Sequence, residues 1–251
     1  MEISEFSKAA EVIASARHGV AFTGAGISVD SGIPDFRSEG GLWSRFDPAE
    51  YGTLQAFLTD PEKVWKMVFD LLSVLEPAKP NPGHEALARL EQLGKLSSVI
   101  TQNVDNLHQE AGNKNVVEIH GNNKRLVCIG CGSNYALKDI LEPSSKTVPK
   151  CPECGRILKP DVVFFGEALP LDAMQQARQQ AVRADVMLVV GTSATVAPAN
   201  LVPQVAKTHG AVIIEVNLET SELTDTLTDI FLSGSASEVL PKLVGEVESI
   251  I

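Results

Sequence analysis

"GAGISVDSGIPDFRS", residues 24–38, decides the fold, because it places a glycine-rich turn directly after the apolar segment "GVAFT". A short buried strand that ends in such a turn is typical of the first unit of a parallel α/β sheet that binds a nucleotide. The dinucleotide fingerprint would place a third glycine at position 29, where the chain has Val29. The pair Gly24 and Gly26 alone also fits an ordinary tight turn, so nucleotide binding needs support from elsewhere in the chain.

Short segments with the same character recur along the chain and alternate with helical patterns. The predicted strands are β-branched and bounded by polar residues or glycine, and they lie at 19–24, 97–101, 186–191 and 211–216. The helical patterns lie at 83–94, 171–185, 197–210 and 235–250. This alternation predicts the α/β class, with a Rossmann-like parallel sheet covered by helices on both faces.

Polar sequences follow several of the predicted strands. "TQNVDN" occupies residues 101–106, "GTS" residues 191–193 and "VNLE" residues 216–219. Ligands bind at the carboxyl ends of the strands in open parallel sheets. Polar or glycine-rich exits that converge there favour a site for a large nucleotide over unrelated turns.

All four cysteines lie in two C-x-x-C pairs, "CIGC" at 128–131 and "CPEC" at 151–154, with 19 residues between the pairs. This spacing predicts a zinc ribbon with the ligands Cys128, Cys131, Cys151 and Cys154. Two disulfides or a redox pair are the alternatives. Disulfides fit a cytosolic chain poorly, and a thioredoxin-like redox site needs only one C-x-x-C pair. Four thiolates leave no position for a catalytic water, so the zinc is expected to be structural.

Two segments interrupt the strand–helix alternation. Residues 36–77 contain a helical run, "PEKVWKMVFDLLSVL", and residues 121–160 contain the cysteines and several prolines. We predict that this helical module and the zinc-binding module together form a smaller domain. The Rossmann-like domain is then made of residues 1–35, 78–120 and 161–251.

The composition is that of an ordinary globular protein. The chain has 251 residues, of which 44% are hydrophobic and 21% charged, and its net charge is −11. An acidic chain repels the nucleic-acid backbone, so no direct nucleic-acid partner is expected. No segment approaches the roughly 18 apolar residues of a membrane span, and the N-terminus does not read as a signal peptide. We therefore predict no membrane association and a cytoplasmic location.

The order of these motifs resembles that of the sirtuins, the NAD-dependent protein deacylases. The resemblance covers about residues 20–240 and is carried by "GAGIS", "GIPDFR", "TQNVDNLH", "HGN", the paired C-x-x-C motifs, "FFGE", "GTS" and "VNLE". It implies an enzyme that deacetylates protein lysines, consumes NAD, and releases nicotinamide and O-acetyl-ADP-ribose. Its partners would be acetylated-lysine proteins or peptides, and it would carry one structural Zn²⁺.

The resemblance also implies which residues contact NAD. Ser28, Asn103 and Asp105 would receive the nicotinamide, where a buried amide needs paired donors and acceptors. The remaining predicted cofactor contacts are Gly24, Ala25, Gly26, Asp35, Phe36, Arg37, Gln102, Gly191, Thr192, Ser193, Asn217, Glu219 and Ala236.

His120, in "EIHGN", stands where the family places its catalytic histidine, and Asn103 is the second predicted catalytic residue. A neutral imidazole near pH 7 can take a proton from a ribose hydroxyl. His108, in "NLHQE", is expected to be an ordinary residue on a helix surface.

The segment "VVFFGE", residues 162–167, resembles the strand that receives the substrate peptide through backbone hydrogen bonds. Taken alone, it also fits an ordinary buried strand. The predicted substrate contacts are Val162, Val163, Phe164, Phe165 and Gly166. Relatives that remove acidic acyl groups carry a Tyr-x-x-Arg pair where this chain has Val68 and Leu71. Neither residue can pair with a carboxylate, so neutral acyl groups are expected.

Three other functions are compatible with parts of the sequence. A mono-ADP-ribosyltransferase would use the same cleavage of NAD. A dehydrogenase is disfavoured by the missing third glycine and by the polar nicotinamide pocket. A zinc-ribbon adaptor with a degenerate NAD-sensing domain is disfavoured because His120 and Asn103 are both present.

Overall fold

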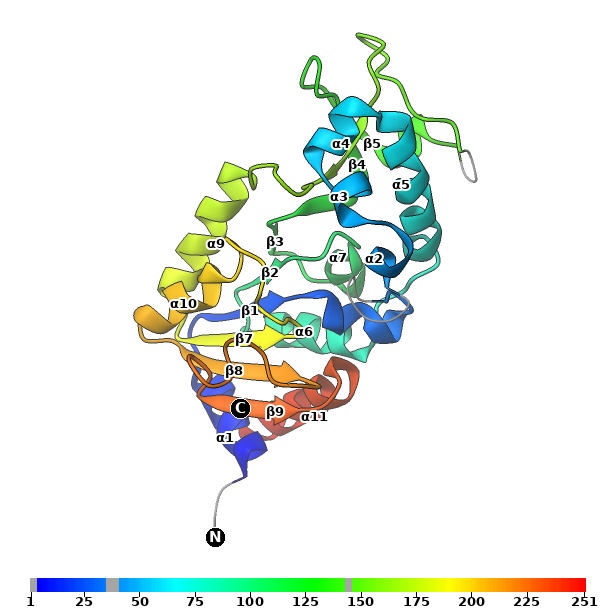
Figure 1. Ribbon diagram of the computed structural model, residues 1–251. Helices are drawn as coiled ribbons and strands as arrows, with labels where there is room; N and C mark the ends of the chain where they lie inside the picture. Colours follow the sequence, from blue (N-terminus) through cyan, green and yellow to red (C-terminus); the bar gives the residue numbers. More distant parts are fainter. Residues whose placement is uncertain (1–3, 35–40, 143–145) are drawn as a thin grey trace.

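The computed structural model describes residues 4–34, 41–142 and 146–251 (Figure 1). The predicted cofactor contacts Asp35, Phe36 and Arg37 lie outside the described residues.

The main body is a parallel sheet of six strands in the order β3-β2-β1-β7-β8-β9. Its strands are β1 (Gly19–Thr23), β2 (Ser98–Thr101), β3 (Val116–Glu118), β7 (Val186–Val190), β8 (Val212–Asn217) and β9 (Ile230–Ser233). The predicted fold class and the four predicted strands are confirmed. The order reverses between β1 and β7, which is where open α/β sheets bind ligands.

Helices cover both faces of this sheet (Figure 1). One face packs on α1 (Glu5–Ser15), α6 (Pro82–Gln92) and α11 (Ala236–Ile250), and the other packs on α9 (Leu171–Arg183) and α10 (Leu201–Thr208). Alternate residues of a strand serve the two faces, so Ala21 packs in the first cluster and Phe22 in the second. None of the helices in the described ranges is long and apolar enough to span a bilayer.

A smaller antiparallel sheet carries the cysteines, with the order β5-β4-β6. Its strands are β4 (Gly121–Val127), β5 (Asn134–Ala136) and β6 (Lys159–Val162), and α8 (Leu137–Ile140) follows β5. The other inserted segment forms four helices, α2 (Leu42–Arg45), α3 (Pro48–Tyr51), α4 (Leu54–Thr59) and α5 (Pro61–Leu75). Of these, α3, α4 and α5 lie beside the small sheet (Figure 1).

The two inserted segments share one apolar cluster. Trp65 of α5 is fully buried in it, and its indole Nε1 donates to the Leu158 carbonyl at 2.9 Å. Phe57 of α4 packs in the same cluster with Leu126 of β4. Such a shared core is what a small domain would need. The domain boundaries remain a prediction.

Candidate functional site

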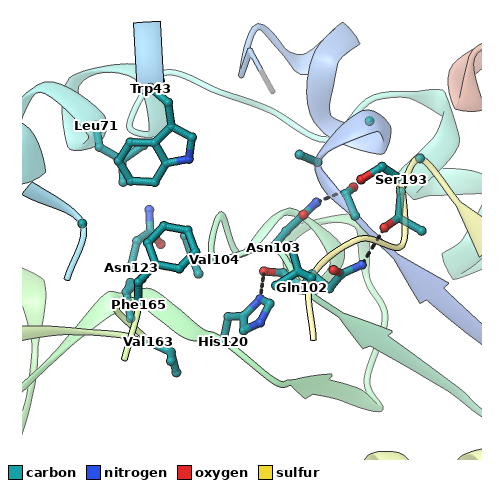
Figure 2. A pocket seen from close by; sticks show the side chains of 18 of the residues that line it. Trp43, Leu71, Gln102, Asn103, Val104, His120, Asn123, Val163, Phe165 and Ser193 are labelled. Atoms are coloured by element: carbon teal, nitrogen blue, oxygen red, sulfur yellow. Dashed lines mark hydrogen bonds between the residues drawn. The ribbon is translucent and has the colours of Figure 1, made fainter. Parts of the chain in front are cut away.

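A cavity of about 1180 Å³ lies at the carboxyl ends of β1, β2, β7 and β8 and extends to α5 and β6. Figure 2 shows its central polar side chains between an apolar group that includes Trp43 and Leu71 and a polar end at Ser193. The structure brings most of the predicted site residues together around it, namely Gly24, Ala25, Gly26, Gln102, Asn103, His120, Val162, Val163, Phe164, Phe165, Gly166, Gly191, Thr192, Ser193, Asn217, Glu219 and Ala236.

The glycine turn after β1 begins a 3₁₀ helix, Ala25–Ser31, and packs tightly against the exit of β7. The Gly24 amide donates to the Val190 carbonyl at 3.0 Å, and the Gly26 amide donates to the Gly191 carbonyl at 2.8 Å. A Cβ on Gly26 would lie 2.7 Å from the Gly191 Cα atom. Both amides are therefore bonded within the protein and are not free to hold a phosphate in this structure. These glycines are needed because two loops approach each other at backbone distance.

Ser28, Asn103 and Asp105 line a second, smaller pocket of about 50 Å³. The Ser28 hydroxyl donates to Asp105 Oδ2 at 2.7 Å, and Asn103 Nδ2 donates to Ser28 Oγ at 3.1 Å and to the Gly24 carbonyl at 3.0 Å. Burial raises the pKa of Asp105, and the hydrogen bonds from the Leu107 amide and Ser28 oppose this shift. These bonds hold a polar pocket of the kind that an amide ligand requires.

His120 lies between β3 and β4, and its ring points into the cavity (Figure 2). Its Nδ1 is 2.9 Å from the Gln102 carbonyl oxygen. Because a carbonyl can only accept, Nδ1 carries the proton and Nε2 keeps its lone pair. Burial lowers the pKa of His120, and the bond to Gln102 partly opposes this. The ring is therefore neutral at pH 7 and can act as a base.

Gln102 connects the histidine to the loop after β7. Its side-chain Nε2 donates to Thr192 Oγ1 at 3.0 Å, while its backbone carbonyl holds His120. Beyond Thr192, Asn217 Nδ2 donates to the Thr192 carbonyl at 2.9 Å. Glu215, which is fully buried, accepts hydrogen bonds from Thr224 and Thr228. The polar strand exits thus form one connected set, as their positions in the sequence predict.

His108 is not on the surface, so the expectation for this residue is wrong. It is 1% exposed in α7 (Leu107–Ala111), and its Nε2 lies 2.9 Å from Thr23 Oγ1. Its ring centroid is 4.9 Å from that of His84, which is also buried. The burial of His108 could not be predicted, because its neighbours in the sequence are mostly polar. In addition, α7 has only five residues, which is too short to show a periodic apolar pattern.

His84 is a site-adjacent residue that sequence reasoning missed. It completes a capping box at the start of α6, where Asn81 Oδ1 accepts from the His84 amide and the Asn81 amide points at His84 Nδ1. Its Nε2 is 3.5 Å from Ser28 Oγ. The signal available in the sequence was "NPGH", with an N-cap asparagine and a proline at the first helical position.

Asn123 and Val104 were also missed. Both line the cavity near His120, and the Asn123 amide donates to the Val104 carbonyl at 2.9 Å. The Asn123 Oδ1 atom is buried and has no hydrogen-bond partner among the described residues. The position of Asn123, directly after the "HGN" motif, was the only hint in the sequence.

The buried histidines lead to a prediction about stability. Burial lowers the pKa of His84 to about 4 and that of His108 well below 6.5. Between pH 6.5 and 4 the unfolded chain binds protons that the folded protein excludes, so stability is full above pH 6.5 and falls as the pH drops. For His84 alone the loss by pH 4 is about 3 kcal/mol at 1.36 kcal/mol per pKa unit. Urea denaturation between pH 8 and 4.5 measures this loss, and H84Q should flatten the dependence. An equally steep fall in H84Q would contradict the assignment.

The predicted substrate segment 162–167 is only partly a strand. β6 ends at Val162, after which the Val163 amide donates to the His120 carbonyl at 2.9 Å. Phe165 then forms two backbone hydrogen bonds with residues at the start of α4. Its amide donates to the Gly52 carbonyl, and its carbonyl accepts from the Leu54 amide. The segment leaves the sheet because its hydrogen bonds pass from β4 to those residues. The predicted extent of the strand is therefore wrong.

The two phenylalanines of this segment differ in environment. Phe164 is 6% exposed and packs against Phe57, at 5.9 Å between ring centroids. Phe165 is 49% exposed and lies 5.9 Å from Trp43 on the same measure. The apolar side of the cavity continues past Trp43 to residues of α5, namely Trp65, Met67, Val68, Leu71 and Leu72. The positions compared with the Tyr-x-x-Arg pair, Val68 and Leu71, thus both line the cavity.

The four cysteines lie together at the end of the small sheet. Their sulfur atoms all lie within 4.8 Å of one another, with 3.4 Å between Cys128 and Cys154 and 3.6 Å between Cys131 and Cys151. None is in a disulfide. Four sulfur atoms at about 2.3 Å from a tetrahedral zinc ion would be separated by similar distances. The donor set therefore fits a structural zinc ion.

Comparisons with known proteins extend over nearly the whole chain. The sequence model of the Sir2 family matches residues 24–198 of this chain. An NAD-dependent protein deacylase of Thermococcus kodakarensis is 49% identical over 247 residues, which are 97% of this chain and 96% of that protein. A solved complex of a Sir2 homologue with NAD has a TM-score of 0.92 at 43% identity, covering 99% of this chain and 95% of that one. Sir2Af2 bound to a myristoylated histone peptide gives a TM-score of 0.82 at 37% identity, covering 98% and 97%.

Proposed function

The chain belongs to the Sir2 family, and we propose that it is an NAD-dependent protein-lysine deacylase that removes neutral acyl groups such as acetyl. The acyl group is transferred to ADP-ribose, so that nicotinamide and O-acetyl-ADP-ribose are released. One observation carries this proposal. His120, with Nε2 free to accept a proton, lies in a single cavity between an apolar region and the polar loops of the sheet (Figure 2).

NAD is a substrate of this reaction, and the residues around the cavity suit its parts. The ADP-ribose lies along the exits of β1, β7 and β8, with the phosphates near Gly191, Thr192 and Ser193 and the adenosine near Asn217, Glu219 and Ala236. Nicotinamide enters the small pocket lined by Ser28, Asn103 and Asp105. Asp35, Phe36 and Arg37 complete this set by resemblance alone.

The chemistry places separate demands on the two ends of the cavity. The acyl oxygen attacks the ribose carbon as its bond to nicotinamide breaks, and the developing positive charge requires exclusion of water. The Asn103 side chain donates to the Gly24 carbonyl and to Ser28 Oγ, so it is fixed where it can orient the ribose carbon that nicotinamide leaves. His120 Nε2 then takes a proton from a ribose hydroxyl, which attacks the acyl carbon. The bond from that carbon to the lysine nitrogen breaks, the lysine leaves as the free amine, and water adds to the same carbon, so that the acyl group stays on the ribose.

The acyl-lysine enters from the side of Val162, Val163, Phe164, Phe165 and Gly166, which line the cavity beside His120. Acylated peptides are the substrate class that Sir2 complexes support, such as the myristoylated histone peptide bound to Sir2Af2. We also keep the division into a Rossmann-like NAD-binding domain and a small zinc-containing domain, the cytoplasmic location, and the absence of nucleic-acid and membrane partners as proposals that rest on the sequence.

The test is incubation of the zinc-loaded protein with NAD and an acetyl-lysine peptide. Deacetylation that matches nicotinamide release one to one, with O-acetyl-ADP-ribose as the third product, is the expected result. ADP-ribose attached to a protein acceptor would instead support the mono-ADP-ribosyltransferase. Formation of NADH would support a dehydrogenase, and binding of NAD without turnover would support a sensor.

A further prediction concerns the acyl group. Because Val68 and Leu71 line the cavity and neither can pair with a carboxylate, succinyl-lysine should be removed at least about 100-fold less efficiently than acetyl-lysine. The measurement is kcat/KM for matched acetyl, butyryl and succinyl peptides. The double variant V68Y/L71R should narrow the acetyl-to-succinyl ratio, and K207M on the distant α10 serves as the control. Equal rates on acetyl and succinyl peptides in the unmodified protein would contradict the prediction.

A further inference from the structure

Lys159, the first residue of β6, is a buried cation that the proposed chemistry does not use. Its side chain is 3% exposed. The ammonium group donates to the Val162 carbonyl at 2.7 Å and to the Pro160 carbonyl at 3.0 Å, and it lies 3.1 Å from Glu167 Oε2. Three acceptors thus face its three hydrogens, and the Phe164 ring centroid lies 4.7 Å from Nζ.

Glu167 completes a closed arrangement around the same segment. Its Oε2 accepts from the Phe164 amide at 3.0 Å, and its own amide donates to the Phe164 carbonyl at 3.0 Å. Together, Lys159 and Glu167 fix the carbonyl before Val163 and the amide after it. The Val163 amide, held between them, donates to the carbonyl of His120.

Burying the Lys159 ammonium beside the partly exposed Glu167 is costly, which indicates that the geometry of this pair matters. Burial lowers the pKa of Lys159, and Glu167 opposes the shift. An apolar pair of similar volume often stabilises a protein as much as a buried ion pair does, so such a pair is weak evidence for a role in stability. An apolar pair cannot form hydrogen bonds to the backbone at residues 160, 162 and 164, whereas Lys159 and Glu167 bind all three.

We propose that Lys159 and Glu167 are a positioning pair that holds residues 162–165 in the shape that receives the acylated peptide. This inference rests on the proposed deacylase function. The pair acts on the peptide side of the site, because Glu167 lines the cavity together with Phe165 and Gly166. The adenosine end, at Asn217 and Ala236, is formed by the exit of β8 and the start of α11. Loss of the pair should therefore weaken use of the peptide and leave use of NAD nearly unchanged.

The experiment measures steady-state kinetics of E167Q, K159M and the double variant with an acetyl-lysine peptide and NAD. Glu167 is partly exposed, and glutamine keeps its size and one acceptor, so E167Q is the variant that keeps the fold. We expect the KM for the peptide to rise about tenfold in E167Q, as for loss of one charged hydrogen bond, with the KM for NAD within about twofold. The double variant should be no worse than K159M, because the two residues act as a unit.

The control is K207M, which breaks the exposed pair of Lys207 and Asp229 on α10. It should change neither KM. A peptide KM within about twofold of the unmodified value in a folded E167Q would overturn the inference, and so would an equal rise in both KM values. If the unmodified protein does not turn over acetyl peptide at all, the proposed function fails instead. Hydrogen exchange at the Val163 and Phe164 amides then tests the pair by itself, and exchange unchanged in E167Q would overturn it.

Discussion

Replacing His120 with alanine is expected to lower kcat for NAD-dependent deacetylation by at least about 100-fold, in the range that a general base supplies. His120 is the residue in the cavity whose neutral form is favoured by burial and whose proton sits on Nδ1, bonded to the Gln102 carbonyl. NAD affinity should change by less than about threefold, because the loops at Ser193 and Asn217 that are proposed to hold ADP-ribose do not depend on the imidazole. Single-turnover rates and calorimetric NAD binding measure the two quantities.

The pH profile separates a base from a residue that only fills space. Since burial lowers the pKa of His120 below 6.5, the fall of activity in acid should be centred below pH 6.5. The residual activity of H120A should not show this fall in acid, because the imidazole that becomes protonated is absent. The matched control is H209A, because His209 is exposed at the end of α10. An unchanged kcat in H120A, or an acid limb centred above pH 6.5, would contradict the assignment.

The sequence was most informative where a strand is long enough to show its character. The segment 186–190 is wholly apolar, and 212–216 is apolar except for Glu215, and both are rich in β-branched residues, so their burial on both faces could be predicted directly. β3 and β9 were not predicted, and β3 has only three residues, which carry too little pattern. They exist because their neighbours, β2 and β8, have backbone groups that need partners, which is a tertiary cause.

Within the site, the sequence could indicate which residues gather but not how each is used. Polar exits from parallel strands must meet, so Asn103, Thr192 and Asn217 could be placed together in advance. The use of the Gly24 and Gly26 amides could not be foreseen, because it depends on the approach of a loop about 165 residues away in sequence. His108 shows the same limit, since its burial comes from contact with Thr23 and His84.

Removing the metal proposed at the four cysteines is expected to abolish deacetylation and to unfold residues 121–160. Cys128 and Cys151 are buried in the apolar cluster that contains Trp65 and Leu158. Without the ion, that cluster would contain unpaired thiolates or an empty space. Structural zinc contributes about 10–16 kcal/mol in isolated zinc-finger peptides, which is comparable to the whole stability of an ordinary domain, about 5–15 kcal/mol. The main sheet should survive, because its clusters on α6 and α9 do not include the cysteines.

The loss should reach catalysis through a short path. Gly121 of β4 pairs with Val162 of β6, and the Val163 amide binds the His120 carbonyl, so unfolding of the small sheet releases the backbone that holds the base. Chelation with hydrogen exchange should show fast exchange in β4 to β6 and slow exchange in β1 and β7, with recovery on adding zinc. Because Cys154 is exposed, C154S mainly removes a ligand and should behave like the chelated protein. I129S, on the exposed turn between two ligands, should not. Metal-free protein with unchanged activity would contradict this role, because His120 would then be held without the small sheet.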